Sequence, residues 1–271
     1  MQEIRQIGNV PWDTARIKES IPEFLDLYSR RPLKDNEGGM LSPHMFAAWF
    51  MLKNLNPENV IESGVWKGQG TWLIENTLPG SRIFSIDINL GMRKYISPQA
   101  RYFSRDFSSI DWDFIKDKNN TVLFFDDHQN AFERLRQAGE MGFKKFIFED
   151  NYPEGQGDCY SLKKAFQHSG FDPGQQGSHS IKSIFKNLLT PRRKHIIAPN
   201  SSDAAHLENV LEVYYEFPPV FRSKNTRWGD EWNEGNYPTP EALYREAENA
   251  SLQLFQQEAA YYTWICFAKL K

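Results

Sequence analysis

The fold of this chain is decided by one stretch, Val60-Ile61-Glu62-Ser63-Gly64-Val65-Trp66-Lys67-Gly68-Gln69-Gly70-Thr71. It begins as a short apolar run that ends in an acid, which is typical of a buried strand. The glycines then mark a turn before a helix that we expect over 71–78. Glycines in such a turn permit positive φ and let a ligand approach the backbone closely. The spacing G-x-x-x-G-x-G differs from the dinucleotide fingerprint, and no Gly-Lys-Ser/Thr follows to form a phosphate loop.

Outward from this stretch, strands and helices alternate. Three more apolar runs without polar alternation indicate strands covered on both faces, at 82–86, 121–125 and 145–148. Helices are expected over 42–55 and 130–141, a further helix over 240–260, and a last strand over 262–268. The alternation predicts an α/β fold, a doubly wound, mostly parallel, Rossmann-like sheet with helices on both faces and a closing C-terminal antiparallel strand.

Composition narrows the class of protein. The chain has 271 residues, 40% hydrophobic and 14% aromatic, enough for one large core and unlike a disordered chain. Two cysteines cannot form a disulfide framework or a cysteine zinc site, and a net charge of −3 gives no reason to expect nucleic acid. No apolar run approaches a membrane span, and the first residues do not resemble a signal peptide. We therefore expect a soluble, cytoplasmic protein with no membrane partner, and leave a homo-oligomer open.

Each of the four strands ends in an acid, and two of these acids suit one ligand. Asp87 comes 23 residues after Gly64, where an acid accepts hydrogen bonds from ribose hydroxyls. Glu62 would repel a pyrophosphate but favour a cation. A ligand with a ribose, a positive charge and no phosphate is S-adenosylmethionine, whose sulfonium also suits an aromatic face such as Trp66. The alternative is that Glu62 and Asp87 cap the following helices.

These residues resemble the class I S-adenosylmethionine-dependent methyltransferases over about 36–152. "VIESGVWKGQGT" is similar to their first motif and "IFSIDIN" to their second strand. The resemblance implies that the glycine loop, with Gly64, Gly68 and Thr71, holds the methionine part and that Asp87 holds the ribose. "NEGGMLSPHMF" resembles the segment of catechol-type enzymes that folds over the cofactor, which implies a contact from Met40. Asp106 would meet the adenine amino group, or be a surface acid.

A second acidic group follows the third and fourth predicted strands, as Asp126-Asp127-His128 and Glu149-Asp150-Asn151. Carboxylate and amide oxygens with open positions suit Mg²⁺ (or Mn²⁺). The alternative is that these residues cap a helix and form a turn.

"FFDDHQN" and "FEDNYP" match the metal positions of metal-dependent O-methyltransferases of the catechol and the macrocin and cephalosporin-hydroxylase-like kinds. The metal ligands would be Asp126, rather than Asp127, with Asp150 and either Asn151 or Glu149. His128, with Asp127 beside it, is the catalytic candidate as general base, although a histidine in a loop can also be a bystander.

The predicted function is a divalent-metal-dependent O-methyltransferase acting on a hydroxyl of a sugar or glycosylated small molecule. The alternatives are a metal-dependent glycosyltransferase using a nucleotide-sugar and a catalytically silent cofactor-binding protein. One domain, 1–271, is expected: a helical cap (1–56), a cofactor-binding core (57–152), an acceptor-side insertion (153–240, with a short helix at 180–189) and a C-terminal helix and strand (241–271). Acceptor contacts are expected from Asp158, Tyr160, Ser161, the aromatic run 214–217, Trp228 and Trp232, and the basic run 182–195.

Overall fold

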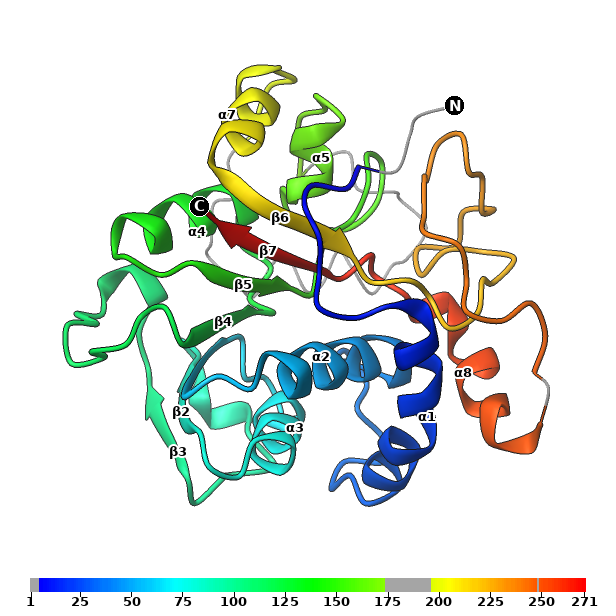
Figure 1. The fold of residues 1–271 in the computed structure, drawn as a ribbon, viewed down its shortest axis with the longest axis horizontal. Helices are drawn as coiled ribbons and strands as arrows, with labels where there is room; N and C mark the ends of the chain where they lie inside the picture. The colour runs from blue at the N-terminus through cyan, green and yellow to red at the C-terminus, as the bar shows by residue number, and fades with distance from the viewer. Residues whose placement is uncertain (1–4, 174–195, 248) are drawn as a thin grey trace.

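The computed structural model describes residues 5–173, 196–247 and 249–271. Within these ranges the chain forms a seven-stranded sheet with the order β3-β2-β1-β4-β5-β7-β6 (Figure 1). Its strands are β1 (Asn59–Ser63), β2 (Arg82–Ile86), β3 (Ala100–Phe103), β4 (Thr121–Phe125), β5 (Lys145–Phe148), β6 (Leu211–Glu216) and β7 (Cys266–Leu270). β1 to β5 pair in parallel, and β7 is antiparallel to both of its neighbours, β5 and β6.

This topology confirms the predicted fold class and places the ligand-binding edge. The order β3-β2-β1-β4-β5 is that of doubly wound sheets, in which the strand order reverses between the first strand and the fourth. Ligands in such sheets bind beyond the carboxyl ends of the strands at that reversal. The residues that follow β1 and β4 therefore occupy the place where a ligand is expected.

Helices cover both faces of the sheet, as expected. α1 (Thr14–Ser29), α2 (Ser42–Leu55), α3 (Gln69–Thr77) and α8 (Gln253–Gln257) pack on one face, and α4 (Ala131–Glu140), α5 (Leu162–Phe166) and α7 (Ser202–Val210) on the other (Figure 1). Val60 and Ile61, neighbours in β1, belong to different hydrophobic clusters. Because each strand buries both faces, its sequence shows no polar alternation. No helix in the described part of the chain is long and apolar enough to cross a bilayer.

The C-terminal region differs from the prediction. The helix expected over 240–260 is wrong: the region forms only short helical turns at Ala250–Leu252, α8 and Ala259–Tyr261. Leu243 and Tyr244 donate their backbone N–H groups to the carbonyls of Pro219 and Val220, so these donors are not available to a helix. The last strand begins at Cys266 rather than residue 262, because Trp264 adopts φ +56°, outside the extended region. The short helix predicted at 180–189 lies outside the described residues.

Candidate active site

The glycine loop after β1 joins the ends of two strands. Gly64 has φ +104°, and a Cβ at this position would overlap the carbonyl oxygen of Asp126, the residue after β4. Its N–H donates to the carbonyl of Ile86 at 2.9 Å. Gly68 has φ +93°, and a Cβ at this position would overlap the carbonyl oxygen of Tyr95. The loop therefore needs glycine at both positions for the backbone conformation and for close packing against neighbouring segments.

Glu62 is a buried carboxylate with one satisfied oxygen. Its Oε2 accepts hydrogen bonds from Thr71 Oγ1 at 2.5 Å and Ser85 Oγ at 2.6 Å, whereas Oε1 is buried with no partner among the described residues. A Cβ on Gly70 would collide with Oε1, so that glycine makes the space for the carboxylate. Burial raises the pKa of Glu62 to about 7, although the two hydroxyls act to lower it. Because its partners are side-chain hydroxyls, Glu62 does not cap the following helix.

This raised pKa predicts a pH-dependent stability. The pKa of Glu62 is about 7 in the folded protein and 4.5 as a free carboxyl, so the folded state binds more protons between these values. The stability gained from the bound proton is complete below pH 4.5 and is lost as the pH rises to 7. We expect the free energy of unfolding of the wild type to fall by up to about 3 kcal/mol relative to Glu62→Gln across this window, measured by urea unfolding. The exposed Glu58→Gln serves as the control, and parallel curves for wild type and Glu62→Gln would contradict the prediction.

Asp87 organises the glycine loop. Its Oδ2 accepts hydrogen bonds from the backbone N–H groups of Val65 at 3.1 Å and Trp66 at 3.0 Å, and its Oδ1 accepts one from Asn89 N at 2.8 Å. These bonds hold Trp66 at φ +47°, and its indole Nε1 donates to the carbonyl of Glu37 at 3.4 Å. The alternative that Asp87 caps a helix is therefore not what the structure shows, since its carboxylate binds the loop itself.

The segment before α2 lies against the same loop. Met40 is 4% exposed, and its terminal methyl lies beside Gly70, close to where a Cβ on that glycine would sit. Asn36 Nδ2 donates to the carbonyl of Met40 at 3.0 Å and so fixes this segment. The structure thus brings Met40, Glu62 and Thr71 together around one loop with Gly64, Gly68, Trp66 and Asp87.

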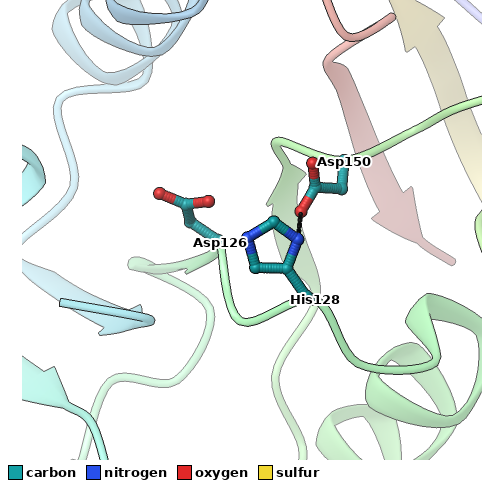
Figure 2. A group of neighbouring side chains, drawn as sticks. All are labelled: Asp126, His128 and Asp150. Carbon is teal, nitrogen blue, oxygen red and sulfur yellow. Dashed lines mark ion pairs between the residues drawn. The ribbon is translucent and has the colours of Figure 1, made fainter. Parts of the chain in front are cut away.

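A second group of side chains lies at the ends of β4 and β5. One ligand atom from each of Asp126, His128 and Asp150 lies within 4.8 Å of the other two, and Figure 2 shows the three side chains as neighbours. His128 Nδ1 is 2.8 Å from Asp150 Oδ2 and 2.9 Å from Asp158 Oδ1. Asp150 is 5% exposed, and its Oδ1 has no hydrogen-bond partner in the described part of the chain. A buried aspartate with an oxygen that lacks a hydrogen-bond partner, beside a second carboxylate and an imidazole, fits a divalent cation.

The charges of this group are strongly coupled. Burial raises the pKa of Asp126, and the negative charge of Asp150 raises it further. Burial also acts to raise the pKa of Asp150, but His128 outweighs it and lowers that pKa to about 2. Burial acts to lower the pKa of His128, yet Asp150 and Asp158 raise it well above the usual value. The two carboxylates beside Nδ1 therefore favour the imidazolium form of His128.

Asp127 and Asp106 lie apart from this group because both bind Arg134 of α4. Arg134 donates to both oxygens of Asp106, at 2.9 and 2.7 Å, and its Nε donates to Asp127 Oδ2 at 2.9 Å. Asp127 also accepts a hydrogen bond from Ser63 Oγ at 2.8 Å. These bonds lower the pKa of Asp106. Of the two neighbouring acids, Asp126 lies in the group with His128 and Asp150, whereas Asp127 and Asp106 have ion-pair partners that sequence spacing did not reveal.

Asn151 and Glu149 have hydrogen-bond partners outside the Asp126–His128–Asp150 group, although the side chain of Glu149 also contacts that of Asp150. Asn151 Oδ1 accepts from the backbone N–H of Lys163 at 3.0 Å, and its Nδ2 donates to Tyr214 Oη at 2.8 Å and to a backbone carbonyl. Glu149 pairs with His44 of α2, and both side chains are buried. The structure therefore does not offer Asn151 to a metal ion, because partners from α5 and β6 occupy its amide group.

The expected acceptor contacts separate into internal and exposed residues. Tyr160 Oη donates to Asp203 at 2.9 Å, Ser161 Oγ donates to a backbone carbonyl, and Tyr214 is fully buried in β6. Trp232 stacks on Trp264 with ring centroids 5.1 Å apart. Trp228 is 40% exposed, and the basic run at 182–195 lies outside the described residues. Of these candidates, Trp228 presents its ring to solvent near the site, and Asp158 contacts His128.

Comparison with known proteins gives weak structural likenesses. No family model and no curated protein sequence matches the chain. Solved structures that are similar to it include an O-methyltransferase from Bacillus cereus in complex with S-adenosylhomocysteine (SAH), at 15% identity over 68% of this chain and 82% of that one, with a TM-score of 0.34. An SAH-bound Podospora anserina methyltransferase, PaMTH1, shows 11% identity over 53% and 73%, with a TM-score of 0.35. CmcI with SAH shows 16% over 55% and 82%, with a TM-score of 0.34. At scores this low the likenesses add nothing to the strand order, which itself establishes the fold.

Proposed function

We propose that this chain is an S-adenosylmethionine-dependent O-methyltransferase that uses a divalent cation, Mg²⁺ or Mn²⁺, and methylates a hydroxyl of a sugar or glycosylated small molecule. The observation that carries the proposal is the meeting of carboxylates from three adjacent strands at the reversal point of the sheet. Glu62 is the penultimate residue of β1, and Asp126 and Asp150 follow β4 and β5. Such a concentration of negative charge suits a positively charged methyl donor and a small hard cation.

The donor would lie over the glycine loop. Gly64 and Gly68 allow close approach, Asp87 fixes the loop and has lone pairs left for ribose hydroxyls, and the unpaired Oε1 of Glu62 adds negative potential beneath the loop. The charge of a sulfonium donor favours the ionised form of Glu62. The negative charge of a nucleoside diphosphate would be repelled by ionised Glu62, and this repulsion disfavours the glycosyltransferase alternative.

The acceptor hydroxyl would lie between the donor and the Asp126–His128–Asp150 group. A divalent cation held by Asp126 and Asp150 would supply Lewis-acid activation and lower the pKa of that hydroxyl. The acceptor oxygen would form a bond to the methyl carbon as the carbon–sulfur bond of the donor breaks, with S-adenosylhomocysteine as the leaving thioether. Nδ1 of His128 contacts Asp150 and Asp158, so Nε2 is the atom that would take the hydroxyl proton, after the imidazolium has released its Nε2 proton to solvent, to which the side chain is 43% exposed. A cation bound by Asp150 would weaken the interaction of that carboxylate with the His128 imidazolium and so would favour release of the proton.

Replacing Asp150 tests the role of the cation. We expect Asp150→Ala to abolish Mg²⁺-stimulated methyl transfer to hydroxylated acceptors while SAH affinity, measured by calorimetry, stays within about threefold of the wild type, because the glycine loop is untouched. Asp113→Ala, at an exposed carboxylate, is the matched control. Equal loss of both properties in Asp150→Ala would mean that Asp150 has a structural role.

Thermal-shift titration separates this function from its alternatives. Stabilisation by SAH supports a methyl donor site, whereas stabilisation by uridine diphosphate glucose and not by SAH supports a glycosyltransferase. SAH binding without turnover of any hydroxylated acceptor in the presence of Mg²⁺ or Mn²⁺ supports the catalytically silent protein.

A further inference from the structure

A β-hairpin that the function has not used brings two side chains to the acidic group. Trp232 N donates to the carbonyl of Lys224 at 2.9 Å, and Asn225 pairs with Glu231 in an antiparallel bridge. At the tip, Gly229 N donates to the carbonyl of Thr226 at 3.0 Å, which closes a turn whose two central residues are Arg227 and Trp228. The hairpin tip, defined here as residues 226–229, is thus held by backbone hydrogen bonds.

Arg227 reaches from the hairpin tip to the end of β5. Its Nη1 donates to Tyr152 Oη at 3.3 Å, and Tyr152 follows Asp150 by two residues. Its positive charge interacts most strongly with Tyr152 and also with the carboxylates of Glu149, Asp150 and Asp126. In the described part of the chain this is the one hydrogen bond that its guanidinium makes, so most of its N–H groups are available to a ligand. Arg227 is therefore a cation with unused donors beside the proposed acceptor position.

Two exposed rings flank this guanidinium. Trp228 is 40% exposed and packs edge-on against Tyr152, with centroids 6.1 Å apart at 70°. Tyr261 is 41% exposed, and the Arg227 guanidinium lies 6.0 Å from its ring centroid. A second contact fastens the hairpin, since Gln156 Nε2 donates to Asp230 Oδ2 at 2.5 Å. Exposed aromatic rings next to a partly exposed arginine suit a flat or ring-shaped ligand with a negative group.

We propose that Arg227, Trp228 and Tyr261 form an acceptor subsite for a hydroxylated ring that bears a carboxylate. This deepens the proposed function and rests on it. The ring lies against Trp228 and Tyr261, the carboxylate pairs with Arg227 through the planar fork of the guanidinium, and a hydroxyl is directed to Asp126 and Asp150. These acids would repel an anionic acceptor, and Arg227 offsets that repulsion. One guanidinium among several acids matches a singly charged carboxylate better than a doubly charged phosphate.

Matched pairs of probes test the subsite by binding rather than by turnover. The pairs are 3,4-dihydroxybenzoate with 3,4-dihydroxybenzamide, and glucuronate with glucuronamide, each titrated by calorimetry with Mg²⁺, with and without SAH. We expect at least one carboxylate to bind the wild type about 10- to 100-fold more tightly than its amide, as a charge-assisted hydrogen bond predicts. In Arg227→Met the carboxylate and its amide should bind with about equal affinity, and in Arg227→Lys part of the preference for the carboxylate should remain.

Other variants separate charge from stacking. Trp228→Leu should weaken both members of a pair and leave their ratio unchanged. The controls are Arg222→Met, at an arginine of the same segment that pairs with Glu234, and Phe114→Leu, at an exposed ring that packs on Phe84 of β2 and Phe103 of β3. An amide that binds as well as its carboxylate, a preference that survives in Arg227→Met, or no binding of either carboxylate overturns the subsite. Absence of SAH binding overturns the proposed function instead, and the ratio measured without SAH still decides the subsite.

Discussion

Replacing Lys163 with methionine is expected to lower the free energy of unfolding by about 3–5 kcal/mol, because it leaves the carboxylate of Glu216 buried without a counter-charge. Lys163 Nζ lies 2.7 and 2.6 Å from the two oxygens of Glu216, and both side chains are buried. Tyr214 Oη donates to the same carboxylate at 2.9 Å, and the backbone N–H of Lys163 donates to Asn151. The ion pair is therefore part of a closed, buried network that holds the segment after β5.

Denaturant unfolding of three variants isolates the uncompensated charge. Lys163→Met combined with Glu216→Leu should recover most of the lost stability, because neither charge then remains buried. Lys269→Met breaks a surface pair with Glu212, 2.6 Å long, and should cost no more than about 1 kcal/mol. If Lys163→Met costs no more than Lys269→Met, the buried pair does not have the role given to it here.

Replacing Gly64 with alanine is expected to destabilise the fold by more than about 3 kcal/mol and to abolish SAH binding. The backbone conformation at φ +104° is strained for any residue with a Cβ, which accounts for about 1–3 kcal/mol. The added methyl also overlaps the carbonyl oxygen of Asp126, so the loops after β1 and β4 must move apart. This movement changes the loop over which the donor is proposed to lie.

Alanine substitutions at two other glycines separate the cost of the backbone conformation from the cost of the steric overlap. Gly80 has ordinary backbone geometry and open space around a Cβ, so Gly80→Ala should change stability little. Gly155 has φ +75° and equally open space, so Gly155→Ala should show the conformational cost alone. Unfolding curves and SAH calorimetry on the three variants provide the comparison. A Gly64→Ala protein that is as stable as Gly155→Ala, or that binds SAH normally, would contradict the close approach to Asp126.

The pattern of apolar residues along the sequence was sufficient to predict much of the sheet. β2, β4 and β5 begin and end where the apolar runs predict, and α2 spans the predicted residues 42–55. Burial of both strand faces requires continuous apolar residues, so the signal lies within each run. β6 was missed because its tyrosines and glutamates do not form such a run. Its Tyr214 and Glu216 are buried only because Asn151 and Lys163, distant in sequence, provide hydrogen-bond partners.

For the site, the sequence by itself determined which strand ends carry acids and glycines, because these follow directly from apolar runs and their boundaries. It therefore placed Glu62, Asp87, Asp126 and Asp150 at one edge of a parallel sheet. Only the tertiary structure decided which acids face a common space. Asp127 and Asp106 form ion pairs with Arg134 and so lie outside this space. Asn151 is hydrogen-bonded to Lys163 and Tyr214. A hairpin distant in sequence places Arg227 beside Tyr152, next to the same space. A charged side chain is directed by the nearest opposite charge or hydrogen-bond partner in space, and sequence spacing does not encode that neighbour.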